Sequence, residues 1–170
     1  NTDAVIAVYP FTPQPQISQA IISVSDVPVF VGVGGGLTSG ERSVRLATVA
    51  ENQGAFGVVV NAPIPPQVIT AIKNCVEIPV IATIVSANQD IEERLAAGVD
   101  ILNVSAAAKT PQVVAKIRDK HPNIPIIATG GPTDQTILAT IQAGANAVTY
   151  TPPSTGELFA QTMQRYRETI

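Results

Sequence analysis

The chain has 170 residues, 45% of them hydrophobic and 14% charged, with a formal net charge of −3, so we expect one domain over residues 1–170 that buries many elements on more than one side. The slight negative charge, with no basic cluster and no apolar run of membrane-spanning length, argues against nucleic acid or a membrane as a partner. Cys75 is the only cysteine, which excludes an internal disulfide and a cysteine-based zinc site and favours a cytoplasmic setting.

Along the chain, seven apolar runs rich in β-branched residues alternate with seven stretches of helical periodicity. The runs predict strands over Ala4–Val8, Val29–Val33, Phe56–Val60, Val80–Ile84, Ile101–Val104, Ile126–Ala128 and Ala147–Tyr150. The stretches after them predict helices over Ile17–Val24, Glu41–Gln53, Gln67–Val76, Gln89–Ala97, Pro111–Lys120, Thr133–Ala143 and Gly156–Glu168. This regular alternation is typical of an α/β fold with a parallel sheet.

The predicted strands begin in two alternating ways. Some begin with a β-branched residue and proline, namely Val27-Pro28, Ile78-Pro79 and Ile124-Pro125. The strands between them follow a glycine that ends the preceding helix, namely Gly54, Gly98 and Gly144. If the first strand is of the glycine type, the series lacks one proline-type unit. We therefore expect strands two to eight of a (β/α)8 TIM-type barrel whose first βα unit is absent, in preference to an open flavodoxin-like sheet.

In such a barrel the functional site lies at the carboxyl ends of the strands, where this sequence places mostly hydroxyl and amide side chains. Asn61 and Asn103 are the amides that we expect to bind a ligand. Glu41 and Lys109 are the candidate catalytic residues, because only they supply an ionisable group suited to proton transfer there. The alternatives are a capping box of Thr38 with Glu41, which we favour, and a loop lysine that attracts an anion. The acidic residues cluster on helices, so we expect no metal site.

The last two strand ends predict a phosphate site. Gly130-Gly131 lies between a strand and a helix, where backbone N–H groups can hold an anion, and Ser154-Thr155 follows the last strand. We expect Arg42, after the glycine-rich loop 32–36, to be a second anion contact. The alternatives are a turn that needs only a positive φ at the glycines and a capping box of Ser154 with Glu157.

The stretch Ile-Pro-Ile-Ile-Ala-Thr-Gly-Gly, a helix, and Ala-Gly-Ala-Asn-Ala-Val, within residues 124–148, resembles the end of the phosphate-binding (β/α)8 barrels. That superfamily includes ribulose-phosphate, indole-glycerol-phosphate and flavin mononucleotide enzymes. The resemblance implies a small phosphorylated ligand, with Gly130 and Gly131 in its phosphate site. In the family the next strand usually ends in Gly-Ser or Gly-Thr, whereas this chain has Thr151-Pro152-Pro153-Ser154, which removes two backbone donors.

Three functions stay open. The first is a lyase or isomerase that acts on a small phosphorylated metabolite without a cofactor. The second is a non-catalytic barrel that binds such a ligand as a sensor or assembly partner. The third is an FMN-dependent oxidoreductase, because the stretch from Gly57 to Asn61 and the two strands after it faintly resemble nitronate-oxidising barrels. We also expect the gap left by the absent unit to be filled by a removed N-terminal segment or by another chain, for example in a homo-oligomer.

Overall fold

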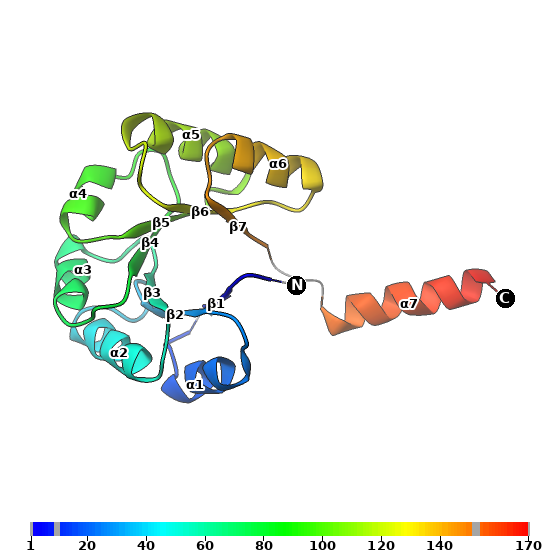
Figure 1. The fold of residues 1–170 in the computed structure, drawn as a ribbon, viewed down its shortest axis with the longest axis horizontal. Helices are drawn as coiled ribbons and strands as arrows, with labels where there is room; N and C mark the ends of the chain where they lie inside the picture. Colours follow the sequence, from blue (N-terminus) through cyan, green and yellow to red (C-terminus); the bar gives the residue numbers. More distant parts are fainter. Residues whose placement is uncertain (1, 9–10, 151–153, 170) are drawn as a thin grey trace.

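The computed structural model describes residues 2–8, 11–150 and 154–169, and it places one curved parallel sheet inside a ring of helices (Figure 1). The strands are β1 (Val5–Ala7), β2 (Val29–Gly34), β3 (Gly57–Val60), β4 (Val80–Ile84), β5 (Ile101–Val104), β6 (Ile126–Thr129) and β7 (Ala147–Thr149). The helices are α1 (Pro15–Val24), α2 (Glu41–Asn52), α3 (Pro66–Lys73), α4 (Ile91–Ala96), α5 (Thr110–Lys120), α6 (Asp134–Gln142) and α7 (Thr155–Thr169), with a short 3-10 turn η1 (Ala107–Lys109).

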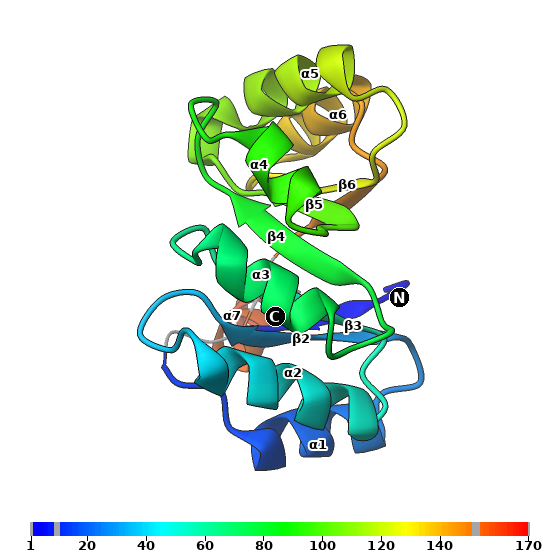
Figure 2. The same ribbon diagram turned by 90° about the vertical axis from the view of Figure 1, so that its left-hand side faces the viewer.

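The strands pair in chain order from β1 to β7, and all six pairs are parallel. Helices α1 to α6 cover the outer face, and Figure 2 shows α1 to α4 side by side along it. This arrangement confirms the predicted partial (β/α)8 TIM barrel. None of the helices that the structure describes is long and apolar enough to cross a membrane.

The strands β2, β3 and β4 are buried on both faces, because successive side chains point to opposite sides of the sheet and both sides are covered. The outward-facing residues pack under the helices in the main core, as Val58, Leu102 and Ile126 do. The inward-facing residues form a second, smaller cluster of Phe30, Val59 and Ile81, with Ile6, Ile101 and Ile127 packed against it. The barrel interior is therefore apolar in the layer that contains Phe30, Val59 and Ile81.

A repeated clasp joins the amino ends of the strands. At β5, Asp100 Oδ2 accepts hydrogen bonds from the backbone N–H of Val80, which follows Pro79, at 2.8 Å and from Lys73 Nζ at 2.7 Å. At β7, Asn146 Oδ1 accepts from the backbone N–H of Ile126 at 2.9 Å and from Arg118 Nη2 at 2.8 Å. In these two pairs the side chain before the glycine-type strand contacts the proline-type strand that precedes it, whereas Phe56 occupies the corresponding position before β3.

The glycines that precede these strands make room for the cation. A Cβ added at Gly98 would lie 2.8 Å from Lys73 Cγ, and one added at Gly144 would lie 3.0 Å from Arg118 Cγ. Both glycines also have positive φ, at 102° and 105°. The glycine is thus needed twice, for the turn and for the side chain that crosses it.

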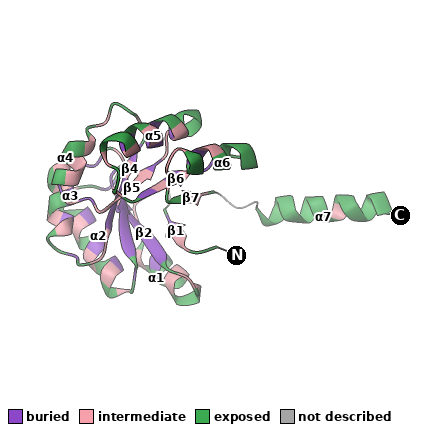
Figure 3. Cartoon of the chain, turned by 45° about the horizontal axis from the view of Figure 1, so that its top comes forward, coloured by how far each residue is buried: buried purple, intermediate pink, exposed green. Residues whose placement is uncertain are grey.

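Helix α7 differs from the other helices because it does not cover the sheet. It extends away from the barrel in Figures 1 and 3, and none of its residues is buried. Leu158, Phe159 and Tyr166 on it are at least half exposed. The sheet has two unpaired edges within the described residues, because β1 pairs only with β2 and β7 pairs only with β6.

Candidate functional site

Four polar side chains line the inside of the barrel at the carboxyl ends of β4, β5 and β6. Asn103 Nδ2 donates to Thr83 Oγ1 at 3.2 Å, and Thr129 Oγ1 donates to Ser105 Oγ at 3.2 Å. They lie two or, for Ser105, four residues beyond inward-facing apolar positions such as Ile81, and they are half-buried. We call Thr83, Asn103, Ser105 and Thr129 the polar ring. Its remaining donors and acceptors can bind oxygen atoms of a ligand, and none of its members carries a charge.

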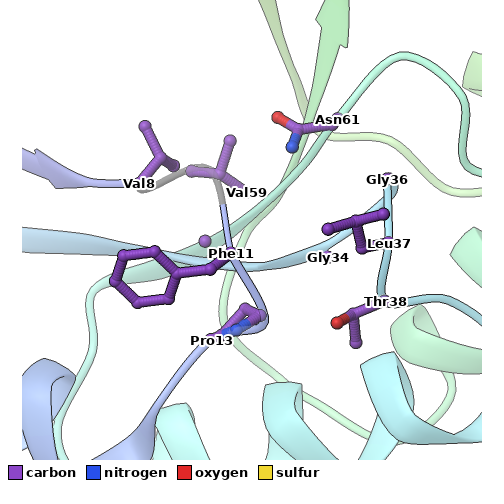
Figure 4. Close-up of a pocket in the computed structure, with 10 residues that line it drawn as sticks. Val8, Phe11, Pro13, Gly34, Gly36, Leu37, Thr38, Val59 and Asn61 are labelled. Carbon is purple, nitrogen blue, oxygen red and sulfur yellow. The ribbon is translucent and has the colours of Figure 1, made fainter.

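Beside the polar ring, a small cavity of about 70 Å³ opens at the ends of β1, β2 and β3. Figure 4 shows Val8 and Phe11 on one side of it, Leu37 on the other, and Thr38 and Asn61 as its polar side chains. Ligand pockets usually measure roughly 300–1,000 Å³, so this cavity has room for one functional group of a ligand and not for a whole metabolite.

The glycine-rich loop after β2 forms one wall of the cavity. Gly35 donates its N–H to Thr38 O at 2.7 Å, and Asn61 donates its N–H to Gly34 O at 2.9 Å. Gly34 and Gly35 have φ values of 134° and 102°, which other residues rarely adopt. These bonds hold the loop against the end of β3 and bring Asn61 to the cavity.

The capping box of Thr38 with Glu41, which the sequence favoured, is wrong. The N-cap of α2 is Gly40, and no side chain caps this helix end. The Thr38 hydroxyl instead donates to Thr12 Oγ1 at 3.0 Å, and Glu41 pairs with Arg45 on the next turn. Since the Glu41 side chain is 77% exposed and occupied by this pair, nothing holds it toward the barrel interior.

The Gly130-Gly131 turn follows β6. Gly130 donates its N–H to Thr149 O at 2.9 Å, and Gly131 has a φ of 85°. A capping box closes the start of α6: Thr136 N–H donates to Thr133 Oγ1, and Thr133 N–H donates to Thr136 Oγ1. Much of the backbone donor capacity of this turn is therefore taken up within the protein.

Ser154 and Thr155 lie at the exposed start of α7. The backbone N–H and the hydroxyl of Ser154 both donate to Glu157 Oε2 at 2.7 Å, and Glu157 N–H donates to Ser154 Oγ at 3.2 Å. This is the capping box that the sequence offered as the alternative. Among the described residues no hydrogen bond joins Ser154 or Thr155 to Gly130 or Gly131.

The capping box makes α7 sensitive to acid. Hydrogen bonds from the Ser154 hydroxyl and then from its N–H hold the pKa of the Glu157 carboxyl below its ordinary value. Because the folded pKa is the lower one, the cap is intact at neutral pH and is lost as the pH falls through that pKa. We expect Ser154→Ala to raise the pKa of Glu157 toward its ordinary value in an NMR titration, and Thr155→Ala to leave it unchanged. Equal titration curves for all three proteins would contradict this assignment.

The candidate cations lie on the rim of the barrel mouth. Lys109 is exposed in η1, shortly after β5, and Arg42 is exposed in the first turn of α2. Within the part of the chain that the structure describes, neither side chain takes part in an ion pair. In the same residues no three His, Cys, Asp or Glu side chains gather closely enough to hold a metal ion.

The structure thus brings Asn103 into the polar ring and Asn61 to the neighbouring cavity, and it leaves Arg42 and Lys109 at the rim. The sequence places Thr83, Ser105 and Thr129 among the hydroxyl side chains at the strand ends, but it did not single them out as ligand-binding residues. Their signal was the period of two: each lies two or four residues after an inward-facing apolar residue, and the strand then ends.

No family model matches this sequence, and no curated protein matches it. Solved structures do. A putative dihydrodipicolinate synthetase from Pseudomonas aeruginosa is 21% identical with a TM-score of 0.63, over 79% of this chain and 51% of that one. A phosphonopyruvate hydrolase in complex with oxalate and Mg++ is 16% identical with a TM-score of 0.64, over 91% and 75%. A phosphoenolpyruvate phosphomutase from Streptomyces platensis subsp. rosaceus is 20% identical with a TM-score of 0.65, over 92% and 66%.

This chain therefore spans about half the length of the synthetase and two thirds to three quarters of the other two. At such identities the similarity concerns the fold. The chain forms part of a (β/α)8 TIM barrel, the fold that it shares with these structures.

Proposed function

We propose that this barrel binds a small phosphorylated metabolite at the carboxyl ends of its strands and acts on it as a lyase or isomerase. The observation that carries the proposal is the polar ring of Thr83, Asn103, Ser105 and Thr129, which faces the barrel interior above an apolar floor. In this fold, side chains at that level contact the ligand. Hydroxyls and amides suit the oxygen atoms of a sugar, a carboxylate or a phosphate.

Two features of the rim and the names of two similar structures support a negatively charged ligand. Arg42 and Lys109 are cations that no ion pair neutralises within the described residues. The amino end of α2 has no side-chain cap, so its first N–H groups are available to an anion. Two solved structures with this fold are named for substrates that contain phosphorus, phosphonopyruvate and phosphoenolpyruvate.

The sequence predicts a different position for the phosphate. That position lies at Gly130, Gly131, Ser154 and Thr155, and it is the alternative to the rim at Arg42. A phosphate there requires the capping boxes of α6 and α7 to yield donors, and Glu157 to be displaced from Ser154. The loop at Gly34–Gly36 and the start of α2 require neither change. We therefore place the phosphate beside Arg42 and the remaining part of the ligand on Asn61 and Asn103.

A non-catalytic ligand-binding barrel is the second candidate, and the neutrality of the polar ring favours it. General acid and base catalysis needs a titratable group within hydrogen-bond reach of the substrate. Of the two candidates, Glu41 is paired with Arg45, which leaves Lys109 as the group that a lyase or isomerase reaction would use. Activity that is lost in Lys109→Ala while binding persists would support the enzyme, and binding without any turnover would support the second candidate.

We expect a phosphorylated compound to stabilise the protein and Asn103→Ala to weaken that binding about tenfold, because one hydrogen bond to a charged ligand is lost. Thermal shift would be measured with phosphoenolpyruvate, a panel of sugar phosphates, inorganic phosphate and FMN. A compound at a hundred times its Kd should add about 2.7 kcal/mol to the free energy of unfolding.

Asn123→Ala is the matched control, because Asn123 lies in the exposed turn before β6, at the opposite end of the barrel. Its affinity should equal that of the unchanged protein. If no phosphate compound stabilises the protein, the proposed ligand class is wrong. If Asn103→Ala and Asn123→Ala bind equally well, the ligand lies elsewhere.

A further inference from the structure

A second and larger cavity lies on the outside of the barrel, between α4 and α5, whose positions Figure 2 shows. It measures about 370 Å³, within the range of roughly 300–1,000 Å³ that ligand pockets usually have. One wall is the segment from Ser86 to Glu92, and the other is the face of α5 that carries Val113, Lys116, Ile117 and Lys120. These residues are different from those of the polar ring and of the cavity at Asn61.

The cavity exists because α4 is short. α4 has six residues and α5 has eleven, so at about 1.5 Å per residue α4 is about 7.5 Å shorter. α3 packs against α4 and α5 packs against α6, whereas α4 and α5 make little direct contact. The segment 85–90, between the end of β4 and the start of α4, takes the place of further helical turns and leaves room beside α5.

Hydrogen bonds fix the wall that this segment forms. Gln89 Oε1 accepts from the backbone N–H of Val85 at 2.6 Å and from that of Ser86 at 3.3 Å. Lys116 Nζ donates to Ala87 O at 2.9 Å, which ties the segment to α5. A ligand that enters the cavity therefore does not have to order this wall, and such preorganisation favours binding.

The acidic side chains of the cavity are already engaged. Asp90 Oδ1 accepts the N–H of Glu93 at 3.0 Å as the N-cap of α4. Glu92 Oε1 lies 3.2 Å from His121 Nε2. Both carboxylates thus have partners within the protein.

The two lysines of the opposite wall have donors to spare. Lys116 and Lys120 are four residues apart and lie on one face of α5. Lys116 gives one of its three N–H donors to the protein, and Lys120 takes part in no ion pair within the described residues. The spare hydrogen-bonding capacity of the cavity is therefore cationic, which favours an anionic ligand.

The rest of the cavity is apolar. Ile91 is half-buried, and Val113 and Ile117 lie in the main core beneath it. A hydrocarbon chain placed against Ile91 removes apolar surface from water. A phosphate dianion would bring a second negative charge near Asp90 and Glu92, whereas a carboxylate brings only one.

We propose that the cavity between α4 and α5 binds a small carboxylic acid with a hydrocarbon chain. The carboxylate accepts hydrogen bonds from Lys116 and Lys120, and the chain lies on Ile91, Val113 and Ile117. This site is separate from the one at the strand ends, and it does not depend on the function proposed for that site.

The probes for the test are hexanoate, acetate, hexylammonium and inorganic phosphate, titrated into the ¹⁵N-labelled protein and followed by NMR. Hexanoate should bind at least tenfold more tightly than acetate, because each further methylene group that is fully buried adds about fourfold in affinity. It should also bind at least tenfold more tightly than hexylammonium, whose charge is opposite, and than phosphate. The shift changes should be largest at residues 86–92 and 113–121.

Three substitutions locate the site. Lys120→Gln should weaken hexanoate binding at least threefold, and Ala87→Phe, which adds a ring at the cavity wall, at least tenfold. The matched controls are Arg45→Gln on α2 and Ala96→Phe at the exposed end of α4, both outside the cavity, and they should bind hexanoate as the unchanged protein does. Asn103→Ala, which alters the polar ring, should also leave hexanoate binding unchanged.

Absence of saturable hexanoate binding would overturn the proposal, and so would equal affinities for hexanoate and hexylammonium. Equal affinities of Lys120→Gln and Arg45→Gln would show that the lysine does not hold the carboxylate. If Asn103→Ala weakens hexanoate binding and Ala87→Phe does not, the acid binds at the strand ends and the assignment to the cavity between α4 and α5 is wrong.

Discussion

Replacing Gly35 with alanine should lower the free energy of unfolding by about 3 kcal/mol, from a left-handed backbone cost of about 1–2 kcal/mol and a steric cost of similar size. A Cβ at Gly35, whose φ is 102°, would lie 2.5 Å from Asn61 N and 2.7 Å from Asn61 O. Both atoms are backbone, so no side chain can rotate away. The loop must move, and with it the wall of the cavity that holds Asn61.

Gly36→Ala is the matched control, because a Cβ at Gly36 would meet no atom within 4 Å. Urea denaturation should show a lower midpoint for Gly35→Ala at unchanged slope and little change for Gly36→Ala. Two equal midpoints would mean that the loop is not held against β3. If the ligand proposal is correct, Gly35→Ala should also weaken binding of the phosphate compound, while Gly36→Ala should not.

Replacing Arg118 with alanine should cost about 2–4 kcal/mol, because its guanidinium group serves several acceptors at once. Its Nε and Nη2 donate to Gly144 O at 3.1 and 2.8 Å, and Nη1 donates to Pro122 O at 2.6 Å and to Ile124 O at 2.9 Å. Nη1 also donates to His121 O at 3.4 Å, and Nη2 donates to Asn146 Oδ1 at 2.8 Å. Arg45→Ala is the control, since its pair with Glu41 is 75% and 77% exposed and should contribute less than about 1 kcal/mol.

The contact between Lys73 and Asp100 at β5 suggests a second substitution that would compensate for the loss of Arg118. Lys73 donates a hydrogen bond to Asp100 at β5 in the same way as Arg118 donates one to Asn146 at β7. Arg118→Lys alone should destabilise the protein, because an ammonium group cannot replace the planar fork. Combined with Asn146→Asp it should recover at least half of the loss, measured by the midpoint of urea denaturation. A double variant no more stable than Arg118→Lys would show that the two clasps are not equivalent.

The candidate site was only partly readable from the sequence. Asn61 and Asn103 follow apolar runs, so their place at the strand ends could be predicted, and the structure puts them beside the cavity and in the polar ring. Glu41 was assigned wrongly to a capping box with Thr38, because whether it does this or pairs with Arg45 depends on where α2 begins. The bond between Ser105 and Thr129 joins residues 24 positions apart and depends on the stagger of the strands.

The sequence by itself determined the order and type of the elements, because strand and helix periodicity and the residues that start a strand are local properties of the chain. The alternation of proline and glycine was enough to predict a partial barrel. Only the tertiary structure decided which polar groups meet, because closure and register bring together residues far apart in the sequence. The contacts of Asp100 and Asn146 show this most clearly: both are ordinary surface polar residues in the sequence, and only the pairing of the strands brings each of them to a backbone N–H of the neighbouring strand.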